Sequence, residues 1–225
     1  MPPVSHIVVG YRTRVAADVQ AHMPEFKAPS NYKDAAKIQA DIAEKQAAFL
    51  LAAKDMPYTG TFDEVHLYDQ KANRAMAWSH KATEEEGKPP VAVRVLNFLL
   101  KYHPKAWDNN THGRKVPEVA FLGFDPRTFL KILGLECTRL AISTPPPLGL
   151  WYSNSDHRDI GEAVMPKECK GLTLPYVLKF RRPLNPDRAK QWDELLDGWN
   201  GPGETARKDA KITIELANQL GFFED

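Results

Sequence analysis

The chain has few cysteines and no long apolar run, and these absences exclude several classes of protein. Only Cys137 and Cys169 occur among 225 residues, and they form no CxxC pair, so thiolates alone cannot build a zinc cluster. No apolar segment reaches membrane-spanning length, and the first residues lack the pattern of a secretion signal. We therefore expect a cytoplasmic protein with no membrane partner, in which both thiols are reduced and buried as small hydrophobic groups.

An excess of one charge is also missing. The formal net charge is +1, so the chain has no global positive field that would attract nucleic acid, although a local basic groove is still compatible with this value. The composition, 43% hydrophobic and 26% charged, is that of an ordinary globular protein. The length is sufficient for one sizeable core, and we predict a single domain over residues 1–225.

Strand and helix patterns are mixed along the chain without an internal repeat, which predicts an α/β domain. Apolar and β-branched runs predict strands over residues 6–13, 63–68, 73–78 and 116–124. Helix formers and capping residues predict helices over residues 35–54, 91–103, 126–133, 193–196 and 204–220. Residues 173–180 fit either a helix or a strand, and residues 83–88 are predicted as a charged loop.

Several stretches are similar to motifs of one nuclease family. Asn31–Ile38 is similar to a family "NYKDPEKI" helix start, and Phe121–Leu130 is similar to "HNxxGFDLPFL". Lys208–Ala217 is similar to "YALNDLELTRELA", and Trp151–Asn154 with Asp159 is similar to "RYWNDRFVDLM". The chain thus resembles the DnaQ-like (DEDD) 3′–5′ exonucleases of the ribonuclease H-like superfamily, in the form predicted from phage genomes. The resemblance implies a ribonuclease H-like mixed central sheet flanked by helices.

The resemblance also identifies candidate site residues. The metal-binding Asp of the second motif corresponds to Asp125, and that of the third motif corresponds to Asp209. The family's first strand carries "FDIET", and its two acidic positions hold Gly10 and Arg12 in this chain. The His-Asn pair before the second motif is also replaced by apolar residues, and no general base remains before Asp209. The resemblance therefore implies that two of four metal-binding carboxylates are lost.

The lost carboxylates matter because two-metal phosphodiester cleavage needs several acidic ligands around ions about 4 Å apart. Residues i and i+2 of a strand point to the same face, so Gly10 and Arg12 occupy the positions of a paired ligand set. Because an arginine is always positively charged, we hypothesise that Arg12 pairs with Asp125, Asp209 or both in place of a metal ion.

Each of these residues also has a purely structural interpretation. Asp125 precedes Pro126 and fits a helix N-cap, and Arg12 fits the rim of the sheet. Asp209 lies near the core-facing stripe of its helix, where an unpaired acid is costly. Asp63 and Glu64 are adjacent on a strand and point to opposite faces, so they are not predicted to form a replacement acidic pair.

Basic residues alternate with tryptophans before the last predicted helix. Such a pattern binds single strands through phosphate contacts and base stacking, although a solvated face with core tryptophans gives the same pattern. The candidate nucleic-acid-binding residues are Lys179, Arg181, Arg182 and Trp192, with Arg188, Lys190 and Trp199 nearby.

Three functions follow from the sequence and the resemblance. The preferred one is a degenerate exonuclease homologue that binds nucleic acid or protein without efficient cleavage and needs no cofactor. The first alternative is an active exonuclease in which Asp125 and Asp209 bind Mg²⁺ or Mn²⁺. The second alternative is a protein-binding host-takeover factor. The expected partners are single-stranded DNA or a replication or host protein.

Overall fold

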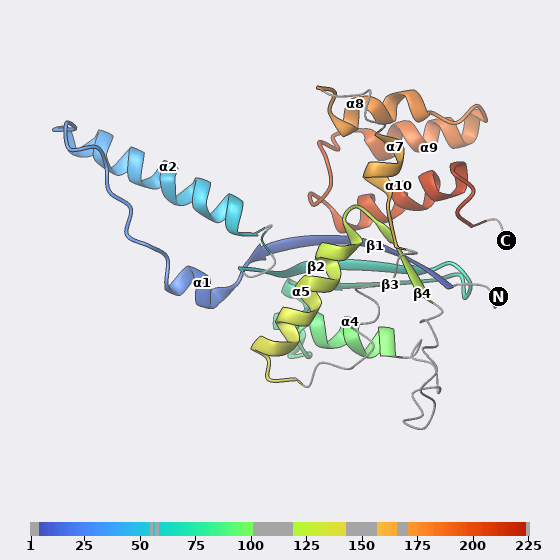
Figure 1. Cartoon of the computed structure of the whole chain (residues 1–225), viewed down its shortest axis with the longest axis horizontal. Coiled ribbons are helices and arrows are strands. Elements are labelled where there is room, and N and C mark those ends of the chain that lie inside the picture. The colour runs from blue at the N-terminus through green and yellow to red at the C-terminus, as the bar shows by residue number, and fades with distance from the viewer. Residues whose placement is uncertain are drawn as a thin grey trace. The chain divides into compact units, whose positions relative to one another are not determined.

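The computed structural model describes residues 5–54, 56, 59–100, 119–142, 157–165 and 171–223, and Figure 1 shows the chain. It has the predicted mixed α/β fold, in which a mixed sheet is flanked by helices; this is consistent with a ribonuclease H-like arrangement. The described strands form one sheet of order β3-β2-β1-β4-β5. Its members are β1 (Ser5–Val15), β2 (Gly60–Asp69), β3 (Arg74–Ser79), β4 (Val119–Gly123) and β5 (Arg158–Asp159).

Strand directions in this sheet are of both kinds. β1 and β5 both run parallel to β4, and β2 pairs with β3 as an antiparallel hairpin. In the register of the central pair, Val9 lies opposite Gly123. Because β1, β4 and β5 share one direction, their carboxyl ends meet at the same edge of the sheet, the edge at which α/β proteins commonly bind ligands.

The described helices include all five that the sequence predicts, with shifted ends in most cases, and several that it does not. They are α1 (Ala17–Ala21), α2 (Ala35–Lys54), α3 (His80–Glu86), α4 (Val91–Leu99), α5 (Pro126–Arg139), α7 (Ile160–Val164), α8 (Leu174–Leu178), the 3₁₀ helix η3 (Lys179–Arg181), α9 (Pro186–Leu196) and α10 (Ala206–Gln219). None of them is long and apolar enough to cross a membrane.

Local capping decides where these helices begin. Asp34 accepts a hydrogen bond from Ala36 N at 2.9 Å, as predicted for the start of α2. The prediction of a charged loop at residues 83–88 is wrong, because Ser79 Oγ accepts from Ala82 N at 3.2 Å and starts α3 upstream. α9 begins earlier than predicted because Asn185 caps it. Residues 101–118, Trp151–Asn154 and Cys169 lie outside the described residues.

Contacts divide the chain into two compact units, and the division falls within β1 and β2. The smaller unit, Thr13–Thr61, contains α1 and α2. Within it the rings of Phe26 and Phe49 are 5.7 Å apart, and Ala16 N donates to Thr59 O at 2.8 Å. The larger unit contains the remaining residues. A single domain over the whole chain therefore stays a prediction.

In the larger unit, helices lie on both faces of the sheet (Figure 1), and each face carries a separate apolar layer. Ile7 and Val9 of β1 pack with α4 and α5, whereas Val8 between them packs with α10. This alternation is the two-residue period of a strand. β4 is buried along its whole length, as predicted for a central strand. Cys137 is fully buried in the first layer, as predicted, and burial raises the pKa of its thiol.

The α10 layer approaches the sheet most closely at Gly10. A Cβ placed on Gly10 would lie 2.0 Å from Ala206 O and 2.7 Å from Ala210 N. Real side chains do not tolerate such distances, so the helix backbone occupies the space where a side chain at position 10 would be. Gly10 is therefore required by packing.

We expect Gly10→Ala to lower the free energy of unfolding by about 3 kcal/mol or more, because α10 must move off the sheet to admit one methyl group. Urea denaturation measures the change. The matched control is Gly87→Asn, since Gly87 adopts φ 59 with open space around its Cβ position and asparagine tolerates that conformation. A Gly10→Ala protein as stable as this control would contradict the close packing.

Candidate functional site

The carboxyl edge of β1, β4 and β5 brings together part of the predicted site. Tyr11 of β1 donates its hydroxyl to Asp125 O at 3.3 Å, and Asp125 N donates to Asp159 Oδ2 at 3.1 Å. These two bonds connect Tyr11 within β1 to the residues at the carboxyl ends of β4 and β5. Asp159, which belongs to the segment similar to the "RYWNDRFVDLM" motif, thus lies beside Asp125 in the structure.

Asp125 serves as the N-cap of α5, which confirms its structural interpretation. Its Oδ1 accepts from Thr128 N at 3.0 Å, and Pro126 takes the first helical position. The backbone of Asp125 is left-handed, with φ 51 and ψ 62, a conformation that Asp tolerates better than most side chains. The sharp turn after β4 and the helix start therefore both depend on this residue.

Asp159 performs the same role for α7 and also holds the β4 turn. Its Oδ1 accepts from Glu162 N at 3.2 Å, while its Oδ2 accepts from Asp125 N. Burial raises the pKa of the Asp159 carboxyl above its ordinary value, and the N–H groups of Glu162, Asp125 and Gly161 partly oppose that rise. The carboxylate is thus a bridge between two strand-to-helix turns.

Arg12 does not pair with Asp125 or Asp209, so that hypothesis is wrong. Arg12 Nη2 lies 2.5 Å from Asp63 Oδ2 on the neighbouring strand, and Nη1 donates to Glu204 O at 3.5 Å. Near the end of β1 the half-exposed guanidinium reaches across to β2, where opposite charges form a cross-strand pair. The sequence does not show which strand lies beside β1, so Asp63 was not predicted as the partner of Arg12.

Asp209 is buried at the start of α10, and its partners come from the loop before that helix. Its side chain is 2% exposed; Oδ1 accepts from Trp199 Nε1 at 2.8 Å and Oδ2 accepts from Gly203 N at 2.7 Å. Burial raises the pKa of Asp209 to about 6; the two N–H donors lower it, and the charges of Glu204 and Glu64 raise it further. The carboxylate therefore fastens the loop to the helix.

These residues do not fit a two-metal centre. The α10 backbone fills the space beside Gly10, Arg12 is ion-paired with Asp63, and both oxygens of Asp209 accept N–H groups. Within the described ranges, no three His, Cys, Asp or Glu side chains gather closely enough to hold a metal ion. The only carboxylate of the two predicted ligands that faces solvent is that of Asp125, and it caps a helix.

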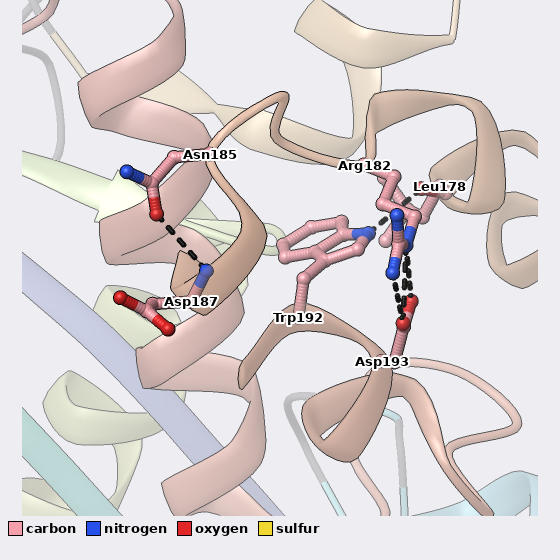
Figure 2. A network of polar contacts seen from close by, with 6 residues as sticks. All are labelled: Leu178, Arg182, Asn185, Asp187, Trp192 and Asp193. Atoms are coloured by element: carbon pink, nitrogen blue, oxygen red, sulfur yellow. Dashed lines mark hydrogen bonds and ion pairs between the residues drawn. The ribbon is translucent and has the colours of Figure 1, made fainter. Parts of the chain in front are cut away.

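The predicted basic residues lie on the surface formed by α8, η3 and α9, which we call the α8–α9 surface (residues 172–200). Lys179 and Arg181 are on η3. Arg182 makes a bidentate pair with Asp193, with Nε–Oδ1 at 2.9 Å and Nη2–Oδ2 at 2.7 Å (Figure 2). This pair lowers the pKa of the Asp193 carboxyl and occupies the Nε and Nη2 donors of Arg182.

Trp192 is not on the solvent side of this surface, which corrects its prediction as a base-stacking residue. Its ring is 1% exposed, and Nε1 donates to Leu178 O at 3.2 Å (Figure 2). The i, i+3, i+4 pattern of α9 turns Trp192 and Ala189 into the core while the charged residues face outward.

Two aromatic residues that are not among the predicted site residues are exposed instead. Tyr176 is 47% exposed and Phe180 is 73% exposed, and their rings meet edge-on with centroids 5.4 Å apart. Their spacing of four residues around Lys179 was the available signal, because it places both rings on one side of a helical turn. A hollow of about 740 Å³ opens beside them, lined in part by Tyr176, Lys179, Asp197 and Asn200.

Comparison of the chain with protein-family models, curated proteins and solved structures finds no match. The similarity to DnaQ-like exonucleases therefore depends on the motifs quoted above.

The raised pKa of Asp209 predicts how stability changes with pH. The folded pKa is about 6 and the ordinary value is 3.8, so the folded state binds this proton more tightly. Stability from this group is present below about pH 3.8 and is lost as the pH rises to about 6. We expect the unfolding free energy of the wild type to fall, relative to Asp209→Asn, by on the order of 3 kcal/mol across that window.

Urea denaturation at several pH values, followed by tryptophan fluorescence, measures this difference. Comparison with Asp209→Asn removes the contributions of Asp159 and other titrating groups, which both proteins share. Asn has only one acceptor oxygen for the two N–H donors, so the comparison uses how each protein's stability changes with pH and not the absolute stabilities. Parallel pH profiles for the two proteins would contradict the desolvated state of the Asp209 carboxyl.

Proposed function

We propose that this chain is a degenerate relative of the DnaQ-like exonucleases that binds single-stranded nucleic acid on its α8–α9 surface and does not cleave it. The observation that carries the proposal is the pairing of exposed aromatic rings, Tyr176 and Phe180, with the neighbouring cations Lys179 and Arg181. Non-specific single-strand binders combine these two components, since bases stack on aromatic faces and phosphates contact basic side chains.

The hydrogen bonds of the acidic residues support the proposal that this chain does not cleave nucleic acid. Asp125, Asp159 and Asp209 each accept backbone N–H groups that hold turns, caps or loops in place. A carboxylate that left such a bond to bind a metal would leave a donor without its partner, at a cost of about 1–3 kcal/mol for a buried group. The acids thus have structural roles in the proposed function.

The two cations are available for phosphate contacts. In the part of the chain that the structure describes, no carboxylate pairs with the Lys179 ammonium or the Arg181 guanidinium, whereas Arg182 and Arg188 pair with Asp193 and Glu215. The net charge of the whole chain is only +1, so binding would be local and moderate in strength. It would also depend strongly on salt because each phosphate contact releases counterions.

A protein partner is the second candidate function, and a specific observation favours it. Leu184 is fully exposed at 101%, and Leu172 at 45% lies on the same α8–α9 surface as Phe180. Exposed apolar side chains that gather on one face often mark protein contacts. Base stacking has no use for the aliphatic residues Leu184 and Leu172, whereas a protein interface would bury both of them.

Fluorescence anisotropy with a labelled single-stranded DNA tests the proposal, with the same samples run on a denaturing gel in Mg²⁺ or Mn²⁺. We expect binding that weakens as salt rises from about 50 mM to about 200 mM, and a strand that keeps its length. Lys179→Ala/Arg181→Ala should reduce the slope of log affinity against log salt by about 1.4, which is about 0.7 for each lost phosphate contact.

The matched control is Lys71→Ala/Arg74→Ala, which removes the same charge from the β2–β3 hairpin and should leave the slope near the wild-type value. Metal-dependent shortening of the strand that Asp125→Asn abolishes would overturn the non-cleaving part of the proposal. Asn is chosen because it tolerates the left-handed backbone and still caps α5. If no strand binds at any salt concentration, the protein-binding function becomes the better one.

A further inference from the structure

The α8–α9 hollow is open to solvent, and its lining is partly polar and partly apolar. Trp192 and Trp199 line it, are 1% and 4% exposed, and donate their indole N–H groups to Leu178 O and Asp209 Oδ1. Because both indole donors are already used, these rings offer the hollow only carbon surface. The volume of about 740 Å³ lies within the range of pockets that hold nucleotide-sized ligands.

An aromatic ring stands at the rim of this hollow. Tyr176 lines the hollow and is 47% exposed, and its edge-on contact with Phe180 restricts its ring orientation. Single-stranded bases that unstack from their neighbours are recognised by stacking on such rings, with hydrogen bonds to the pairing edge of the base. The hollow therefore has the wall on which a base could stack.

Four charged residues line the hollow, two of each sign. Arg182 and Asp193 both line it, but they neutralise each other in the bidentate pair. Lys179 and Asp197 remain. Lys208 Nζ donates to the backbone carbonyl of Asp197 at 2.5 Å, while no donor in the described residues contacts the Asp197 carboxylate. A ligand that suits this hollow would present an anion to Lys179 and N–H donors to Asp197.

Asn200 adds a second acceptor to the same lining. Its Nδ2 donates to Glu204 Oε1 at 3.0 Å and its backbone N donates to Glu204 Oε2 at 3.1 Å, which holds the side-chain amide in place. With the nitrogen used in this way, the amide oxygen is the atom that Asn200 can offer to a ligand. The hollow thus offers a ligand two acceptors, the Asp197 carboxylate and the Asn200 amide oxygen, and one cation, Lys179.

The nucleobases differ in how well they match this lining. Guanine presents two adjacent N–H donors on its pairing edge, and the two oxygens of a carboxylate accept both in parallel. Thymine and uracil present one N–H between two carbonyl oxygens, which a carboxylate repels. Adenine and cytosine place one amino donor beside an acceptor nitrogen, so they pair with a carboxylate through a single bond.

We propose that the α8–α9 hollow binds a guanine base of the single strand, with the base stacked on Tyr176, its pairing edge on the Asp197 carboxylate and its phosphate at Lys179. This inference rests on the proposed single-strand binding and names the base that the site selects. It assigns a role in base specificity to Asp197, the residue that follows the last turn of α9. Neither the motifs nor the basic residues of the sequence indicated this role.

Strands of about ten thymidines that differ only in one central nucleotide test the inference. At constant salt, we expect the strand with a central guanosine to bind about tenfold more tightly than the strand of thymidine alone, as one good bidentate base contact allows. Asp197→Asn should remove most of this preference. The matched control is Glu194→Gln, an exposed acid of α9 that does not line the hollow, and it should keep the preference.

Three outcomes separate the failure of this inference from failure of the proposed function. Equal affinity for all four strands would overturn the guanine site while leaving single-strand binding intact. A guanine preference that survives in Asp197→Asn would place the selective contact elsewhere and also overturn it. Failure of every strand to bind would overturn the proposed function and the guanine site together. Circular dichroism of both variants confirms that a lost preference is not lost folding.

Discussion

Direct contact between the backbone of α10 and β1 at Gly10 is the constraint on which the larger unit depends. Because position 10 lacks a Cβ, the first turns of α10 lie against the strand itself, and Ala206 and Ala210 supply the small side chains that this approach needs. The same approach buries Asp209 and places Ala210 and Ala217 of α10 in one apolar layer with Val8 and Leu122 of the sheet. A larger residue at position 10 would separate α10 from the sheet.

Close packing at this point also determines what the nearby acids can do. Once α10 lies on the strand, Asp209 has little contact with water, and the loop residues Trp199 and Gly203 supply its hydrogen bonds. At the neighbouring strand ends, Asp125 and Asp159 cap helices and bond to one another through Asp125 N. These three acids thus stabilise turns, helix starts and a loop.

The exposed features of the molecule lie elsewhere, on the α8–α9 surface. There the aromatic pair Tyr176 and Phe180, the cation Lys179 and a hollow bordered in part by Trp192 and Trp199 occur together. The walls of this hollow are connected to the α10 packing through one bond, because Trp199 donates its N–H to Asp209. The buried acid and the surface that we propose for binding therefore share one loop.

The sequence by itself determined the mixed α/β class, the central strand and the positions of α2, α4, α5 and α10, because hydrophobic period and capping residues act within a few neighbours. Asp34 and Asp125 cap the helices that follow them for this local reason. Only the tertiary structure decided that Arg12 pairs with Asp63, that Trp192 is buried, and which donors meet Asp209. Those outcomes depend on which strands are neighbours and on how closely a helix packs, and both are set by contacts between residues far apart in the chain.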